Sequence, residues 1–345
     1  MLPLKDITVN AQLVDHLLVG ARHCGIDVSS LLSRCGVSQL DLETTGKRVP
    51  VVSAVKLAHL CTLEMEDEAQ GLLAKPLPRG ALRLTALSAG QTKTIKSALQ
   101  RYIDFINFFQ NTCAMRLARN GRQAIVIYDR IPNQTPIDDV AIPYMMTIMH
   151  RLLGWLANMR IVPLRIHLDI PKPVYSSEFQ YIFFGAPILF DQPEISISFD
   201  ASHLDYPILQ TEQAIEHYVQ RAPLDVYLPM SLGGELSMQI AALVNKSITE
   251  KLEPPRLADV AVEFDMTVQN LRKKLKSEGT SFHTIVSQAR RDIAIFYLTN
   301  DEMTVEFIAE RTGYTEPSAF IRAFKQWTGL TPLQFKKGKI TDIED

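Results

Sequence analysis

The N-terminal part of the chain shows two hydrophobic periods, one helical and one extended. Apolar residues recur every three or four positions, as on one face of an α-helix, in several segments. These helical segments are Gln12–Cys24, Val51–Glu64, Thr94–Phe109 and Asp138–Asn158. Ser29, Ser53 and Asp138 are residue types that cap free backbone amides, so we expect helices to begin at these positions.

The extended pattern follows the third of these helices. Apolar and polar residues alternate in Ala114–Ala118 and Ala124–Tyr128, which is the spacing of a half-buried β-strand. The intervening Arg119–Gly121 contains Asn-Gly, the strongest short signal for a β-hairpin. Leu164–Ile170 and Ile195–Phe199 predict further strands. The N-terminal part is therefore expected to be α+β, and it is too helical for an all-β barrel.

A cluster of proline and glycine separates this region from one that is helical throughout. The segment Ala222–Gly234 breaks the helical periodicity, which is typical of a linker. A chain of 345 residues has room for about two domains. We expect an α+β domain over 1–221, a linker over 222–234 and an all-α domain over 235–340.

The helical region contains an internal repeat. Its first helices correspond at an offset of 48 residues, as Val260 does with Ile308. Its second helices correspond at an offset of 49 residues, as Leu271 does with Phe320. Two copies of one short pattern indicate that the same structural unit is built twice.

Each copy has the pattern of a helix-turn-helix unit, because residues with special turn chemistry stand at its turn and helix ends. They are Gly313 in the second turn, Thr267 and Thr315 as N-caps, Pro317 in the first helical turn, and Gly279 and Gly329 as left-handed C-caps. Apolar residues four apart, Leu271 with Leu275 and Phe320 with Phe324, would hold the second helix to the first. The opposite face of each second helix is then free.

The free faces carry side chains that suit DNA. In a helix-turn-helix unit the second helix lies in the major groove, and its early residues contact base edges. The first copy offers Gln269, Arg272 and Lys273, with Lys274 in the same run of cations. The second copy offers Pro317, Ser318 and Arg322, with Lys325 nearer the backbone side. An amphipathic helix from Ser281 to about Thr299 would set the spacing of the two units.

The region Leu232–Lys337 resembles the AraC/XylS family of transcription regulators. The motifs that carry the resemblance are Ile308–Glu310, Gly313–Tyr314, Ser318–Phe320, Arg322–Lys325, Trp327, Gly329, Pro332 and, in the first copy, Gly279–Phe282. The resemblance implies seven helices with two helix-turn-helix units, and base contacts at the six positions from Gln269 to Lys273 and from Pro317 to Arg322 named above. Pro317 cannot donate a side-chain hydrogen bond, so the second unit would depend more on phosphate and shape contacts.

The segment Phe183–Phe190, followed by Ile195–Phe199, resembles the effector domain of the ornithine-utilisation type of these regulators. This implies that 1–221 binds a small-molecule effector or mediates self-association, without naming the effector or the residues around it. A helix over Thr211–Arg221 and the linker would transmit the signal. The initial helices depart from the sugar-binding barrel of the arabinose regulator, so arabinose is not carried over.

Composition and charge limit the class of protein to which the chain can belong. The chain is 46% hydrophobic and 21% charged, which is ordinary for a globular protein. From Glu235 onward it has 15 Lys and Arg against 16 Asp and Glu, so its cations are clustered rather than in excess. The clusters are Arg272–Lys276, Arg290–Arg291 and Lys336–Lys339. The apolar runs fall short of the ~18 residues of a membrane span, so we expect a cytoplasmic protein without membrane contact.

No catalytic or metal site is expected, and neither is a cofactor. Cys24, Cys35, Cys61 and Cys113 form no Cys-x-x-Cys pair, which favours reduced, buried thiols. Aromatic residues are expected in the core, namely Phe324, Trp327 and the stripe of Tyr102, Phe105, Phe108 and Phe109.

The sequence therefore predicts a ligand-responsive transcription regulator. Its expected partners are double-stranded promoter DNA, a small-molecule effector, a second copy of the chain and RNA polymerase. Two alternatives stay open: an enzyme in the N-terminal domain that is tethered to DNA, and a DNA-binding protein whose N-terminal domain only dimerises. Activation and repression are not distinguished.

Overall fold

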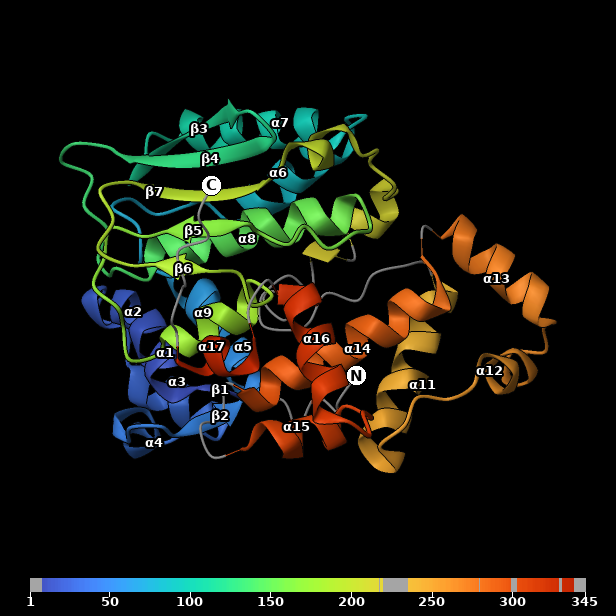
Figure 1. The fold of residues 1–345 in the computed structure, drawn as a ribbon. Coiled ribbons are helices and arrows are strands. Elements are labelled where there is room, and N and C mark those ends of the chain that lie inside the picture. The colour runs from blue at the N-terminus through green and yellow to red at the C-terminus, as the bar shows by residue number, and fades with distance from the viewer. Residues whose placement is uncertain are drawn as a thin grey trace. The chain divides into compact units, whose positions relative to one another are not determined.

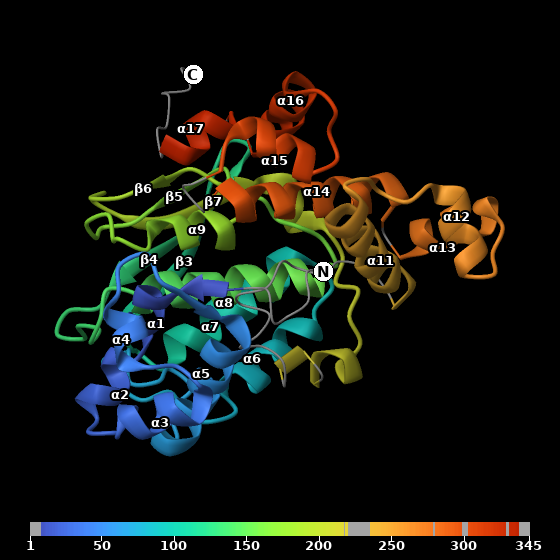
Figure 2. The same cartoon turned by 90° about the horizontal axis from the view of Figure 1, so that it is seen from below.

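The computed structural model of the chain forms two compact units, shown in two views in Figure 1 and Figure 2. It describes residues 8–216, 218–219, 235–278, 280–298, 303–328 and 331–337. Within these residues the first unit runs from strand β1 (Thr8–Asn10) to the 3-10 helix η2 (Ala201–Asp205), and the second runs from α11 (Glu235–Lys251) to α17 (Pro332–Lys337). The segment Phe183–Pro187 groups with the second unit. The expected linker, 222–234, lies outside the described residues.

The first unit contains a five-stranded sheet with the strand order β3-β4-β7-β5-β6. Its strands are β3 (Cys113–Asn120), β4 (Gln123–Arg130), β5 (Arg165–His167), β6 (Ile188–Leu189) and β7 (Ile195–Asp200). All neighbours are antiparallel except β5 and β6. Asn120 pairs with Gln123 across a two-residue turn whose Gly121 has φ +55°. The predicted hairpin is therefore confirmed, and so are strands at Leu164–Ile170 and Ile195–Phe199.

A second, two-stranded sheet pairs β1 with β2 (Arg48–Pro50). Arg48 holds this sheet to α9 (Ser176–Ile182), since its Nη1 donates to the Glu178 carboxylate at 2.5 Å and its Nε donates to Thr8 Oγ1 at 2.8 Å. Burial raises the pKa of Glu178, while the Arg48 charge opposes that shift. Removing either partner would leave the other charge buried and uncompensated, which is strongly destabilising.

The first unit also contains helices. They are α1 (Ala11–Leu17), α2 (Val19–His23), α3 (Val28–Cys35), α4 (Gln39–Glu43), α5 (Val51–Met65), α6 (Ala81–Gly90), α7 (Ile95–Phe108), α8 (Ala141–Leu156) and α9. Residues 212–216 and 218–219, within the helix predicted over Thr211–Arg221, are helical as well. Figure 1 shows α7 beside the β3–β4 hairpin. The helices predicted over Val51–Glu64 and Thr94–Phe109 are confirmed by α5 and α7.

The single helix predicted over Gln12–Cys24 is wrong, because the chain bends at Leu18 and forms two helices. After the bend, α2 lies directly against the segment Gln70–Gly71. A Cβ at Gly20 would come within 2.2 Å of the Gln70 carbonyl oxygen, so only glycine allows this approach. The interruption between α1 and α2 thus accompanies a contact with a segment about 50 residues away, which the local hydrophobic pattern does not reveal.

The three predicted helix starts are also wrong. Helix α3 begins at Val28, where Asp27 accepts from the Ser30 amide at 3.2 Å, so Ser29 is already inside the helix. Helix α5 begins directly after Pro50, which places Ser53 within its first turn. Helix α8 begins at Ala141, and the carboxylate of Asp138 is instead bonded to His16 Nδ1 at 2.9 Å and to the Val140 amide at 2.9 Å.

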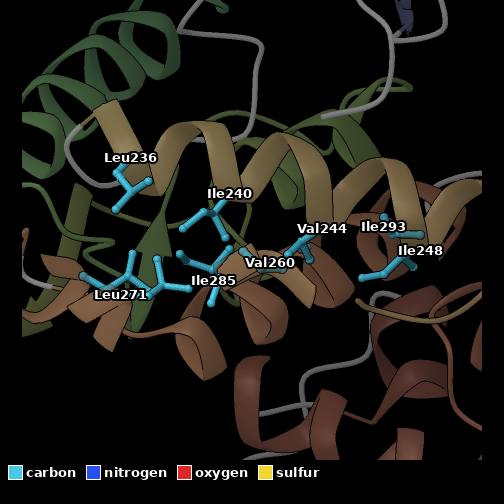
Figure 3. Close-up of a cluster of buried hydrophobic side chains, with 11 residues drawn as sticks. Leu236, Ile240, Val244, Ile248, Val260, Leu271, Ile285 and Ile293 are labelled. Carbon is cyan, nitrogen blue, oxygen red and sulfur yellow. The ribbon is translucent and has the colours of Figure 1, made fainter. Parts of the chain in front are cut away.

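The described part of the second unit contains the seven expected helices. They are α11, α12 (Leu257–Glu263), α13 (Val268–Ser277), α14 (Phe282–Leu298), α15 (Val305–Arg311), α16 (Pro317–Thr328) and α17. Every fourth residue of α11 is buried, which is the spacing of one helical face. Figure 3 shows these residues, Leu236, Ile240, Val244 and Ile248, packed with Val260, Leu271, Ile285 and Ile293. The core of the first helix-turn-helix unit is therefore aliphatic and is closed by α11 and α14.

The core of the second helix-turn-helix unit is aromatic. Phe324 lies at its centre, with its ring 5.7 Å from that of Phe320 and 5.4 Å from that of Phe335. All three side chains are buried. The prediction of a core role is confirmed for Phe324, whereas Trp327 is half-buried and donates from Nε1 to Ser287 Oγ on α14 at 2.9 Å.

Candidate nucleic-acid interface

The two helix-turn-helix turns have the same backbone hydrogen bonds at an offset of 48 residues. The bonds are Asp265 N to Val262 O and Met266 N to Ala261 O in the first turn, and Gly313 N to Glu310 O and Tyr314 N to Ala309 O in the second. The left-handed position is Gly313, with φ +76°, in the second turn and Asp265, with φ +51°, in the first. The positive φ expected at Gly313 is confirmed, and the equivalent role of Asp265 was missed because it is not glycine.

The helix caps differ between the two units. Thr267 Oγ1 accepts from the Asn270 amide at 3.2 Å, which confirms Thr267 as the N-cap of α13. Thr315 is not the cap of α16, because that helix begins two residues later at Pro317. The extra residue that changes the repeat offset from 48 to 49 is therefore inserted just before α16. The expected C-caps Gly279 and Gly329 lie outside the described residues.

Helix α13 presents a cationic face opposite its buried face. Leu271 and Leu275 are fully buried, whereas the side chains expected to contact DNA, Gln269, Arg272, Lys273 and Lys274, are all exposed. The helix carries four cations and no acidic residue. Within the described part of the chain, the four side chains expected to contact DNA make no hydrogen bond or ion pair. They are therefore available to bases and phosphates.

Helix α16 has the same arrangement with fewer charges. Phe320 and Phe324 are fully buried, and the exposed side includes Ser318, Arg322 and Lys325. Pro317 is half-buried at the first position of the helix. Because only two of these side chains are cationic, the second unit offers a weaker attraction for phosphate than α13 does.

The connecting helix α14 is bonded to the second turn. Arg290 Nη2 donates to the Gly313 carbonyl at 2.9 Å, and its guanidinium lies over the Tyr314 ring, 4.5 Å from the centroid. Arg291 is 6% exposed and lies 3.5 Å from Asp292. Arg290 and Arg291 therefore form a cluster in sequence, as expected, but both guanidinium groups make contacts inside the unit. Lys337 and Lys339 of the third expected cluster have no described side chain.

The first unit contains a cavity of about 280 Å³ between α5, α6, α7 and α8. Tyr102, Phe105 and Phe109 of the predicted aromatic stripe line it. Phe108 was expected in the core and is instead 81% exposed, because it lies near the end of α7 with its ring against Phe109. A concave apolar site of this kind is the usual setting for a small molecule.

The cysteines do not form a reactive site. Cys24 is exposed, and the other three are buried. Burial raises the pKa of Cys61 to about 11 and that of Cys113 to about 12, so both thiols stay protonated near neutral pH. Among the residues with described positions, no group of three metal-ligand side chains comes together. No described helix combines the length and apolar character of a membrane span.

Two family comparisons match the two units. The family described as a helix-turn-helix domain matches residues 260–338. The family described as the arabinose-binding domain of AraC transcription regulators, N-terminal, matches residues 25–208, which is more than half of the chain. The chain belongs to the AraC family. Its α13 and α16 are accordingly the second helices of the two AraC-type helix-turn-helix units.

Curated AraC-family relatives resemble this chain over part of their length. An uncharacterized HTH-type transcriptional regulator of Mycobacterium tuberculosis is 42% identical over 83 residues, 24% of each chain. The ornithine utilization regulator of Pseudomonas aeruginosa is 22% identical over 193 residues, 56% of each chain. The crystal structure of the transcriptional regulator CdpR from P. aeruginosa is 17% identical, covers 90% of this chain and 96% of that one, and has a TM-score of 0.31. The matches thus span from about a quarter to just over half of the curated relatives.

Proposed function

We propose that this AraC-family protein is a sequence-specific regulator of transcription that binds double-stranded promoter DNA. The observation that carries the proposal is the pair of outward faces on α13 and α16, each opposite a fully buried apolar face. Gln269, Arg272 and Lys273 would contact bases, and Lys274 would contact phosphate. On α16, Ser318 and Arg322 would contact bases, Pro317 would pack against the groove, and Lys325 would contact phosphate.

In this proposal the N-terminal domain, 1–221, binds a small-molecule effector, and the domain over 235–340 binds DNA. The linker, 222–234, joins them. The effector acts because it binds one of two arrangements of the domains more tightly than the other. The cavity among α5, α6, α7 and α8 supports an effector role for the first unit. The protein would act in the cytoplasm as a homodimer beside RNA polymerase, and its action would be binding rather than catalysis.

The experiment is selection of bound duplexes from random DNA by the full chain. A motif of two half-sites with one strongly specified segment is expected, because α13 carries more base-reading and cationic side chains than α16. Equal recovery of all sequences would contradict the proposal. The same selection is repeated with candidate ligands added. If no ligand changes which DNA sequences are bound or how tightly, the alternative in which the first unit only dimerises is favoured.

A further inference from the structure

Some of the polar side chains that line the N-terminal cavity already form hydrogen bonds with the protein backbone, and others do not. Among the residues that the structure describes, the one acidic side chain in the wall is Glu68, whose two carboxylate oxygens accept from the amides of Gly80 at 2.6 Å and Leu82 at 2.7 Å. Asn111 both accepts from and donates to the backbone of Lys75, at 3.0 and 2.7 Å. The described part of the wall therefore has no free carboxylate that could receive a cationic ligand.

Arg79, in contrast to Glu68 and Asn111, has a side chain without a hydrogen-bond partner among the described residues. It lines the cavity and is exposed, so it stands at the opening. Within the described part of the chain its guanidinium makes no hydrogen bond and no ion pair. A guanidinium is always charged near neutral pH and presents donors in a fixed planar fork that matches a carboxylate. The cavity thus has an apolar interior and a free cation at its edge.

The backbone around Arg79 is fixed on both sides. The amide of Leu77 donates to Asp67 Oδ1 at 2.7 Å, and the amide of Gly80 donates to Glu68. Asp67 also accepts from the amides of Ala69 at 2.8 Å and Gly71 at 2.8 Å. The loop that carries Arg79 is therefore held in one conformation before any ligand arrives, which lowers the entropy cost of binding.

The size of the cavity limits the ligand. An apolar cavity of about 150 Å³ holds one benzene molecule, so a cavity of about 280 Å³ suits a ligand of roughly ten non-hydrogen atoms. The walls away from Arg79 are mostly aliphatic and aromatic, with Leu72, Leu73 and Ile106 beside the aromatic residues of α7. A chain or ring of about eight carbons would leave little of this apolar surface in water.

We propose that this cavity binds a small carboxylic acid, with its apolar body of about eight carbons in the interior and its carboxylate paired with Arg79. This inference rests on the proposed function, because the carboxylic acid is the effector only if the protein is a ligand-responsive regulator. A cation of the same size finds no free acidic partner here. A neutral ligand cannot form the bidentate ion pair that a carboxylate forms with the Arg79 guanidinium.

The test is calorimetric titration of the full chain with three probes of nearly equal size: octanoate, 1-octanol and octylammonium. Octanoate is expected to bind at least tenfold more tightly than 1-octanol, and octylammonium more weakly than both. Equal affinity of octanoate and 1-octanol, tighter binding of octylammonium, or no binding of octanoate up to about 1 mM would overturn the proposal.

Variants assign the effect to Arg79 and to the cavity. Arg79→Gln should lower octanoate affinity about tenfold and leave 1-octanol binding unchanged. Arg122→Gln, in the exposed β3–β4 turn, is the matched control and should leave both unchanged. Leu82→Trp, at a half-buried wall position, should weaken both probes, with circular dichroism to confirm its fold. Unchanged octanoate affinity in Arg79→Gln contradicts the proposal whether or not Leu82→Trp folds.

DNA binding is measured on the same samples without any probe. If octanoate binds through Arg79 but no DNA sequence is preferred, the proposed function fails and the ligand site stands. If DNA is bound specifically but octanoate is not bound, the ligand class fails and the DNA-binding proposal stands.

Discussion

The guanidinium of Arg290 lies over the ring of Tyr314, 4.5 Å from its centroid, and donates to the carbonyl of the preceding residue, Gly313. One side chain of the connecting helix thus fixes the turn that sets the direction of α16. The hydrogen bond and the cation–π contact both fix the position of this guanidinium.

Arg290→Ala should destabilise the second helix-turn-helix unit by about 1–3 kcal/mol, because a charge-assisted hydrogen bond is lost at a crowded turn. The chain has two tryptophans, Trp155 and Trp327, so a Trp155→Phe background leaves Trp327 as a fluorescent reporter of this unit. Urea unfolding followed by that fluorescence measures the change. Lys246→Ala, at an exposed position of α11, is the control. Equal midpoints for Arg290→Ala and the control would show that the contact does not stabilise the turn.

Arg272→Ala should weaken DNA binding by about 1–3 kcal/mol and relax the preference at one or two base pairs, because a bidentate base contact is removed. The measurement is competitive binding to the selected site and to single-base variants of it. Loss of affinity with an unchanged preference would mean that Arg272 contacts phosphate instead.

Lys274→Ala should lower the slope of log affinity against log salt concentration by about one, with little change in base preference. The cause is the loss of one neutralised phosphate and of the counterions released there. Titrations at several salt concentrations give the slope. A changed base preference at constant slope would show that the DNA-facing side of α13 is rotated from the one assigned here.

The pair His16–Asp138 should make stability depend on pH. The hydrogen bond that His16 Nδ1 donates to Asp138 raises the pKa of His16 above 6.5, and burial opposes this shift. While Asp138 is ionised, the stabilisation by the charged pair is therefore complete below about pH 6.5, and it is lost as the pH rises through the raised value. The difference in unfolding free energy between the wild type and His16→Gln should shrink over that range.

A double-mutant cycle with Asp138→Asn separates this effect from packing. The His16 ring also lies 4.8 Å from that of Tyr175, a contact that is lost in His16→Gln at every pH. The interaction energy of the cycle should fall with rising pH. An interaction energy that is constant or rises across this range would contradict the assignment.

Local patterns predicted the parts of the fold that are held by local interactions. The Asn120–Gly121 hairpin and the Thr267 cap depend on residues within three positions of each other, so the sequence contains all the chemistry they need. The repeat predicted the buried and exposed faces of α13 and α16 because helical periodicity decides them. The shift from an offset of 48 to 49 was visible, although its location before Pro317 was not.

Distant contacts decided the elements that were predicted wrongly. One carboxylate oxygen of Asp138 accepts from the nearby Val140 amide, but the other is bonded to His16, which is 122 positions away. The sequence showed Arg290 only as one of two adjacent cations, because its hydrogen-bond acceptor, the Gly313 carbonyl, is 23 positions away. The sequence contained the aromatic side of the cavity wall, in Tyr102, Phe105 and Phe109. The rest of the wall could not be predicted, because it depends on Asp67 and Glu68 accepting from amides that are 10 to 14 residues further along the chain.

The glycine contact of α2 has a consequence for how ligand size can change among related proteins. A methyl group at Gly20 would lie 2.2 Å from the carbonyl oxygen of Gln70, and Gln70 is part of the cavity wall. Main chain meets main chain there, with no side chain that could be shortened to make room. A larger ligand therefore cannot be accommodated by moving this backbone toward α2, and it needs smaller side chains in the wall instead.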